Sequence, residues 1–540
     1  MESKTKLEIN HRRLSPEPPE LAGFYSTHQQ LHQLSIRMQD RDVNASANRP
    51  DRDKFQGHSG IVSSAGKEEV FVKWLSENGA KFVDRALLRC YENDVRGVHA
   101  ARDLKAEEII IEVPLKCLIT VEMGKATDVG RAVLEAGLEL DAPKHIFLML
   151  FLLLDRCNSD SFFRPYYDVL PGSLSNMPIF WKPNELTWLE GSYLLVQIEE
   201  RKCAIQNDFK AIVDAWPAFK RICTLDEFSW ARMCVCSRNF GIVINGVRTS
   251  AMVPYADMLN HFRPRETKWT FDNTRGAFTI TALQSIPSGG QIYDSYGQKC
   301  NHRFLLNYGF AVEDNYECDG YCPNEVALLV RLAPEDPLTA RKRLIWIRDG
   351  AVGVKRIRLC ASDNENFRAC LSLLRVVAAD EVELDRILSQ NPYGTYRTAS
   401  DIHVPVSFRN ECAALSLLKH TCKSMLEAYP RSLAADKSAI SSNALSPFSN
   451  ERHACIHVKS EKLVLCHYIN FAKTALNLAR CHDGEFEATV SRLFDEPVHR
   501  HVASYCNGVV RQVRHAVPKL LSVESDRRQH KLNLSTPTIV

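Results

Sequence analysis

The side chains best suited to form a site gather in one stretch of the sequence, residues 253–310. It holds three motifs, which are VPYADMLNH at 253–261, GGQIYDSYG at 289–297 and NHRFLLNYGF at 301–310. Each motif alone is weak, because an Asn-His pair usually makes local hydrogen bonds and a Tyr-Gly pair is a common turn. Together they place amide, imidazole and phenol groups close in sequence, which makes them the strongest candidate site in the chain.

Strand-like and helical segments alternate around these motifs. Short β-type runs fill 84–120 and return at 242–296, where KWTFD, the turn NTRG and AFTITAL predict a hairpin. The intervening stretch 129–240 has helical periodicity, and the chain after 323 is helical throughout. The sequence therefore predicts an α+β fold, in which a β-rich domain with a helical insertion precedes an all-α domain.

Composition shifts set the expected domain boundaries. Residues 1–66 are polar and predict a disordered leader, and 521–540 predict a flexible tail. The β-rich domain is expected at 67–322, with its helical insertion at 129–240, and the α-helical domain at 323–520.

The overall composition excludes several classes of protein. The chain has 540 residues, of which 45% are hydrophobic and 25% charged, so it is neither wholly disordered nor a disulfide-stapled mini-fold. Its 68 Lys and Arg nearly balance 65 Asp and Glu, which argues against nucleic acid as a partner. The polar N-terminus lacks the core of a signal peptide, and the longest apolar run, 146–154, falls short of the about 20 residues that span a membrane. An intracellular protein, cytoplasmic or nuclear, is expected.

The 18 cysteines lack the spacing of a metal or disulfide framework. No CxxC pair occurs, and the closest pairs are Cys234/Cys236 and Cys318/Cys322. Two thiols do not make a four-ligand zinc site, so we predict no metal and mostly reduced, buried cysteines.

In order and spacing, the three motifs resemble those of the SET-domain protein methyltransferases. They are most similar to the subgroup of the Rubisco large-subunit lysine methyltransferase and the actin-histidine methyltransferase. Residues 96–122 resemble the first strands of that subgroup, 180–194 its helical insertion and SRNF at 237–240 the end of that insertion. The helices from about 334, with Asn410 and Tyr429, resemble its substrate-binding domain. The resemblance implies a SET domain with a threaded, pseudoknot core.

That resemblance also implies S-adenosylmethionine as cofactor and methyl transfer to a protein nitrogen. A lysine acceptor must be neutral although its ordinary pKa is about 10.4, so a narrow apolar channel would both disfavour the ammonium and align the reactants. On the family's pattern Tyr296 is the essential catalytic tyrosine and also contacts the cofactor, and Tyr308 lines the acceptor channel beside it.

The resemblance further implies a set of cofactor-binding residues. Arg238 would pair with the cofactor carboxylate, Asn260 and His261 would hold its amino-acid end and adenine, and Phe310 would stack near the adenine. Glu122 matches a position that contacts the ribose or adenine end.

Two substrate-channel positions bear on the acceptor. The histidine-modifying relative has an amide at the site matched by Phe240 and a tryptophan at the site matched by Ala256. Phe240 cannot hydrogen-bond an imidazole, but its ring can flank a lysine stem and attract its charge. Lysine methylation is therefore the main expectation; the alternatives are actin-type histidine methylation and a non-catalytic SET-scaffold binding protein. We expect a monomer whose protein substrate docks on the C-terminal helices, with no direct contact to nucleic acid or membrane.

The chain departs from the family's pattern in its first cofactor-binding turn. The family usually has GxG there, and this chain has Val95 in place of the first glycine, followed by Gly97. His99 stands where a basic residue is common, and Gly290 replaces an acidic residue. These changes predict weaker cofactor binding.

Overall fold

The computed structural model describes most of the chain from residue 61 to residue 515. The described residues are 61–62, 66–91, 95–317, 320–347, 354–360, 364–389, 404–442, 444–496 and 499–515. The predicted tail lies outside them, as does nearly all of the predicted leader. Ordered structure nevertheless begins before the expected boundary at 66, because Ile61 and Val62 pair with a strand of the first sheet.

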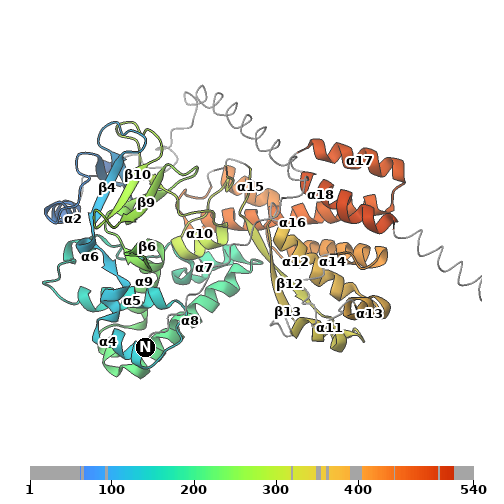
Figure 1. Ribbon diagram of the computed structural model, residues 1–540, viewed down its shortest axis with the longest axis horizontal. Coiled ribbons are helices and arrows are strands. Elements are labelled where there is room, and N and C mark those ends of the chain that lie inside the picture. The colour runs from blue at the N-terminus through green and yellow to red at the C-terminus, as the bar shows by residue number, and fades with distance from the viewer. Residues whose placement is uncertain are drawn as a thin grey trace, which may run out of the picture. The chain divides into compact units, whose positions relative to one another are not determined.

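The β-rich part consists of small sheets (Figure 1). Three sheets have three strands each and the fourth has two. They are β1 (Ile61–Val62), β2 (Ala86–Tyr91) and β3 (Arg96–Ala100); β4 (Ile109–Pro114), β10 (Ala277–Ala282) and β9 (Thr267–Asp272); β5 (Ile119–Thr120), β7 (Val247–Met252) and β6 (Asn239–Ile244); and the parallel pair β11 (Tyr293–Asp294) and β8 (Asn260–His261). Strands from before the helical insertion thus pair with strands that follow it, β4 with β10 and β5 with β7.

The predicted hairpin is confirmed. β9 and β10 pair antiparallel in continuous register, from Thr267 opposite Ala282 to Asp272 opposite Ala277. The Asp272 side chain closes the turn by accepting hydrogen bonds from the backbone N–H groups of Thr274 and Arg275. The polar turn therefore ends both strands by local hydrogen bonding, as Asx turns do.

Helices fill the insertion and cover the sheets. The helices up to the end of the β-rich part are α2 (Gly66–Glu77), α3 (Val121–Lys125), α4 (Asp128–Glu135), α5 (Pro143–Arg156), α6 (Arg164–Val169), α7 (Pro183–Leu186), α8 (Leu194–Ala215), α9 (Leu225–Arg238) and α10 (Asn301–Tyr308). α9 begins with a capping box, in which Thr224 accepts from the N–H of Glu227 and Glu227 accepts from the N–H of Thr224. It ends at Arg238 and leads directly into β6, so the helix fixes where that arginine lies.

The C-terminal part is mainly helical, as predicted, but it opens with a strand pair. The elements are β12 (Glu325–Arg331), α11 (Thr339–Ile347), β13 (Val354–Cys360), α12 (Asn364–Ala378), α13 (Glu381–Ser389), α14 (Phe408–Glu427), α15 (Leu433–Ser441), α16 (Asn450–Arg480), α17 (Asp483–Asp495) and α18 (Arg500–Tyr505). The expectation of helix throughout is wrong at β12 and β13, which pair antiparallel. In β12 the buried residues Val326, Leu328 and Val330 alternate with less buried ones. This strand-like alternation cannot be recognised in the sequence, because most residues of so short a run are apolar.

The two parts share one hydrophobic core. At their contact, the Arg431 guanidinium lies over the Trp188 ring at 4.2 Å and donates to the Trp188 carbonyl. Buried Ser192 and His457 hydrogen-bond across the same boundary at 3.1 Å. Side chains of the helical insertion therefore join the C-terminal helices to the β-rich part. Within the described residues, none of the helices has both the length and the apolar character needed to cross a bilayer.

Candidate active site

Tyr296 is held from three sides, just after β11. Its hydroxyl donates to the carbonyl of Leu259 at 2.8 Å, and its backbone N–H donates to Nδ1 of His261 at 3.0 Å. Its ring stacks on His261 and on Tyr308, with centroids 5.1 and 4.8 Å apart. Because Nδ1 of His261 accepts a hydrogen bond, that imidazole is the neutral tautomer with its proton on Nε2.

Five rings form what we call the aromatic group: His261, Tyr296, Phe304, Tyr308 and Phe310. Burial raises the pKa of Tyr296, raises that of Tyr308 to about 12 and lowers that of His261 to about 3. All three side chains are therefore uncharged at neutral pH, and the group presents an apolar wall that carries protonated hydroxyls.

Asn260 ties three segments of the chain together beside this group. Its Nδ2 donates to the carbonyl of Arg96 at 2.9 Å and to Oε1 of Gln291 at 2.8 Å. The parallel pairing of β8 with β11 sets Asn260 opposite Tyr293. Space here is tight, because a Cβ at Gly97 would lie 2.9 Å from Oε1 of Gln291. A side chain at position 97 would therefore have to displace the Gln291 amide that Asn260 holds.

Arg238 lies in a buried charged cluster. Its Nη1 donates to the carbonyl and to Oδ2 of Asp257, both at 3.1 Å, and Tyr166 donates to the same Oδ2 at 2.9 Å. Burial opposes the charge of Arg238, but Asp257 outweighs it and raises the pKa of the guanidinium, which stays charged. Next to this pair, Arg96 lies 3.6 Å from Glu68 and its pKa is lowered by burial and by Arg238.

Several polar atoms of this cluster are buried without a hydrogen-bond partner. They are Nε of Arg238, Nη1 of Arg96, Oδ1 of Asp257 and Oε2 of Glu68. A buried group without a partner costs about 1–3 kcal/mol. Unpaired donors and acceptors side by side fit a ligand end that carries both a carboxylate and an ammonium, which is the chemistry of the amino-acid end of S-adenosylmethionine.

The remaining predicted residues are not members of the aromatic group. Phe240, in β6, packs edge-to-face on Trp269 and Phe278, with centroids 5.4 and 5.0 Å away. Ala256 is buried in the segment that leads to the Leu259 carbonyl. Glu122 is exposed and pairs with Lys125 at 3.0 Å, so its contacts lie on its own helix rather than at the site.

Some residues of the site had no sequence signal of their own. Arg96, Asp257, Tyr166 and Gln291 all support predicted residues. Asp257 and Gln291 lie within the motifs at 253–261 and 289–297, but neither of them received a role from the sequence. Lys299 donates to the backbone carbonyl of Tyr296, and its Nζ lies 5.7 Å from the centre of the Tyr308 ring. Position within a motif could have identified Asp257, and position next to one Lys299, but the pairings of Arg96 and Tyr166 depend on the fold.

Two family models match the chain. The SET domain matches residues 95–297, and the Rubisco LSMT substrate-binding domain matches residues 333–465. The chain is a SET-domain protein with a Rubisco LSMT substrate-binding domain. The SET-domain match includes Arg238, Asn260, His261 and Tyr296, whereas Tyr308 and Phe310 follow it.

Curated relatives and solved structures agree with this assignment. The SET-domain protein is 28% identical over 410 residues to an actin-histidine N-methyltransferase of Dasypus novemcinctus, a match covering 73% of this chain and 68% of that one. The Homo sapiens protein of the same name is 28% identical over 411 residues, covering 73% and 67%. A structure of the SET domain of LSMT bound to lysine and AdoHcy has a TM-score of 0.62 at 23% identity and covers 76% of this chain and 92% of that chain. A structure of Rubisco LSMT bound to AdoMet has a TM-score of 0.61 at 22% identity, with coverage of 76% and 93%.

Proposed function

We propose that the chain is an S-adenosylmethionine-dependent protein N-methyltransferase whose acceptor is a lysine of a folded protein. One observation carries the proposal. The Tyr296 hydroxyl of the aromatic group is held on the carbonyl of Leu259. Two residues before Leu259 lies Asp257, a member of the buried charged cluster that has unpaired donors and acceptors. The names of the curated relatives and the AdoMet and AdoHcy in the solved structures support the same chemistry.

The cofactor's amino-acid end is assigned to Arg238 and Asn260. Bound there, S-adenosylmethionine would supply a methyl group activated by a positively charged sulfur. Arg238 offers its unpaired Nε, and both hydrogens of Nδ2 of Asn260 are already used, so Oδ1 is the atom left to accept from an ammonium. Phe310 would stack near the adenine, and backbone groups at Asn260 and His261 would hold it, as the resemblance implies.

At the acceptor, the residues position and desolvate rather than exchange protons. The Tyr296 hydroxyl donates to the Leu259 carbonyl, so its oxygen lone pairs are free to accept from an amine N–H and turn the nitrogen towards the methyl group. Tyr296 and Tyr308 both keep their protons at neutral pH because burial raises their pKa values. The same apolar wall disfavours an ammonium and so favours the neutral amine that can react.

Lysine is proposed over histidine because of the Phe240 ring, which the resemblance assigns to the substrate channel. The ring has no hydrogen-bonding atom to orient an imidazole, yet the nitrogen gains positive charge as it is methylated, which an aromatic face stabilises. Histidine methylation is the second candidate, favoured by the name of the curated relatives, actin-histidine N-methyltransferase. The C-terminal helices are proposed to dock the protein substrate, in line with the substrate-binding match.

The deciding experiment identifies the modified atom. The purified full chain and labelled S-adenosylmethionine are incubated in two reactions, one with cell extract and one with actin. The labelled residue is then mapped by mass spectrometry. Label on a lysine supports the main proposal, and label on a histidine replaces it with the second candidate. A folded sample that binds no cofactor by calorimetry would instead indicate a binding protein on a SET scaffold.

Replacement of Arg238 by lysine should weaken cofactor binding. Lysine keeps a positive charge beside buried Asp257 but cannot present the rigid fork of the guanidinium to a carboxylate. Loss of one charge-assisted hydrogen bond, about 1.5–3 kcal/mol, predicts an increase in Kd of about 10-fold or more by calorimetry. Arg232→Lys is the matched control, because Arg232 is buried in the same helix and pairs with Asp141 instead. If Arg232→Lys raises the Kd for the cofactor as much as Arg238→Lys does, the role given to Arg238 is wrong.

Replacement of Phe240 by asparagine should lower lysine methylation. The change removes the aromatic face and the contacts with Trp269 and Phe278. Loss of about 0.5–1 kcal/mol of attraction to the charged nitrogen predicts a fall of several-fold in kcat/KM for a lysine peptide. Phe240→Tyr, which keeps the ring, should retain transfer, and an undiminished rate in Phe240→Asn would show that the ring does not face the acceptor.

A further inference from the structure

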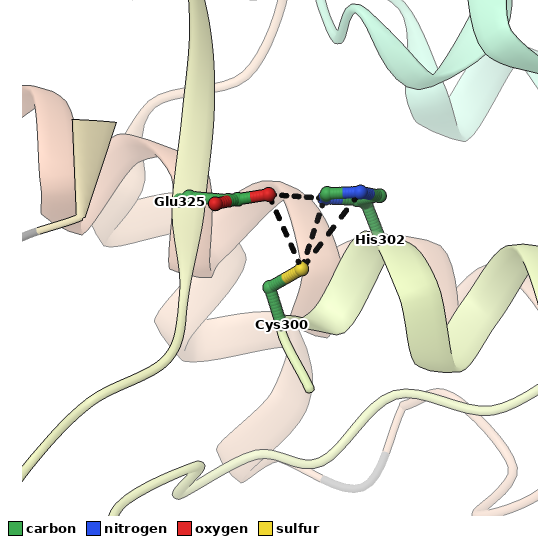
Figure 2. Close-up of side chains that lie close together, drawn as sticks. All are labelled: Cys300, His302 and Glu325. Carbon is green, nitrogen blue, oxygen red and sulfur yellow. Dashed lines mark hydrogen bonds and ion pairs between the residues drawn. The ribbon is translucent and has the colours of Figure 1, made fainter. Parts of the chain in front are cut away.

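Three side chains that bind metals in many proteins converge where α10 begins. Figure 2 shows Cys300 and His302 from the start of α10 facing Glu325, the first residue of β12. Sγ of Cys300 lies 3.2 Å from Nδ1 of His302 and 3.5 Å from Oε1 of Glu325, and Nδ1 lies 3.7 Å from the same Oε1. Within the part of the chain that the structure describes, no other group of three or more such residues converges in this way.

These separations match those of ligands around a zinc ion. Zinc binds cysteine sulfur at about 2.3 Å and histidine nitrogen or carboxylate oxygen at about 2.0–2.2 Å, in tetrahedral geometry. Ligands at those lengths and angles lie about 3.3–3.6 Å from one another. Because Nε2 of His302 also lies 3.8 Å from the sulfur, the His302 ring would have to turn to aim a nitrogen lone pair at an ion between the three side chains. We propose that Cys300, His302 and Glu325 form a zinc site, with a water or another small ligand completing the coordination.

The surroundings supply the support that metal ligands need. Cys300 stands at the N-cap of α10 and makes no side-chain capping hydrogen bond. Burial raises the pKa of its thiol, so the thiolate would form only as the sulfur bonds to the ion. Arg358 lies 3.2 Å from Oε1 of Glu325 and would hold that carboxylate in place from the outside. His302 is buried, and neutral imidazole is the form that binds zinc.

The site would tie the two domains together. Cys300 and His302 follow the matched SET domain, and Glu325 precedes the matched substrate-binding domain. α10 also carries Tyr308 at its other end. A zinc ion here would thus brace the helix that places Tyr308 in the aromatic group against the first strand of the C-terminal part.

The alternative is a hydrogen-bonded cluster without metal. In that state the Cys300 thiol donates to Glu325, and Arg358 neutralises the carboxylate. The test therefore has to detect an ion bonded to sulfur, not only a change in stability. Full-length protein, prepared without a metal-binding tag, is stripped with a chelator, incubated with one equivalent of zinc, desalted and measured by elemental mass spectrometry. A second sample receives cobalt(II), whose absorption reports thiolate bonding and tetrahedral geometry.

We expect about one zinc per chain and a thiolate-to-cobalt charge-transfer band in the wild-type protein. Cys300→Ser and Glu325→Gln should lower metal affinity by more than the about 10–100-fold that loss of a supporting residue costs. Cys455→Ser is the matched control, because Cys455 is also buried and lies 3.7 Å from a carboxylate oxygen, that of Asp436; it should keep the ion. No retained zinc in the wild type, no sulfur band with cobalt, or equal metal in Cys300→Ser would each overturn the proposal. The wild-type cobalt spectrum decides the matter even if a variant fails to fold.

Discussion

Replacement of Tyr296 by phenylalanine should reduce methyl transfer by about 100-fold or more while leaving cofactor binding nearly unchanged. The change deletes the one hydroxyl that the aromatic group holds at a defined position, through its bond to the Leu259 carbonyl. Removal of a single preorganised hydrogen-bonding group costs about 10²–10³ in kcat in well-studied enzymes. The stacking of the ring on His261 and Tyr308 is kept, so the site should retain its shape.

Tyr255→Phe is the matched control for that variant. Tyr255 is also buried, and its hydroxyl also donates to a backbone carbonyl, that of Ala86 at 3.0 Å. Both variants leave one carbonyl without its donor and should lose similar stability, about 1–3 kcal/mol. Only Tyr296→Phe should lose transfer. Initial rates with labelled cofactor, calorimetry and thermal unfolding separate the two effects, and a Tyr296→Phe enzyme with wild-type turnover would refute the catalytic assignment.

The sequence predicted which side chains come together wherever residues close in the chain are also close in space. Asn260, His261, Tyr296, Tyr308 and Phe310 come from one short stretch, and the structure gathers most of them into the aromatic group and its border. Their motifs carry both the turn chemistry and the reactive groups. Hence local sequence was enough to predict that these side chains lie near one another.

Partners far apart in the chain could not be found in this way. Tyr166 reaches Asp257 across 91 residues, a pairing that only the packing of the insertion on the β-rich part creates. The resemblance gave Arg238 a ligand as its partner, whereas in the structure its Nη1 binds Asp257. Sequence spacing likewise drew attention to Cys318 and Cys322, although Cys318 lies outside the described residues and the convergent group contains a different cysteine, Cys300. The spacing of residues along the chain gives no sign that the start of α10 lies beside the first residue of β12.

The strands β12 and β13 show a different limit. EVALLVR has apolar residues in positions that satisfy a helical period as well as a strand period over so short a run. What decides between them is pairing with β13, which supplies a partner for every residue of β12. Such pairing is a tertiary property, and it overrides local preference.

Replacement of Arg375 by methionine should destabilise the C-terminal domain by about 3–5 kcal/mol. Arg375, in α12, binds Glu411 of α14 through Nε and Nη2 at 2.7 and 2.8 Å, and the two side chains are only 2% and 1% exposed. Tyr505 of α18 donates to the same carboxylate, so one buried charge joins three helices. Without Arg375 that charge has no cation beside it in a site that water does not reach. Denaturant unfolding followed by circular dichroism measures the loss.

The double variant Arg375→Met/Glu411→Gln tests whether the uncompensated charge is the cause. Glutamine removes the charge yet can still accept from Tyr505, so the double variant should recover much of the stability that the single variant loses. If both variants are equally unstable, the loss comes from the shape of the arginine stem and not from the ion pair. Lys423→Met is the exposed comparison, because Lys423 pairs with Glu427 at the surface of α14, where solvent screens the pair and no measurable change is expected. Cofactor binding should persist in Arg375→Met wherever the SET domain stays folded, since the residues assigned to the cofactor lie outside these three helices.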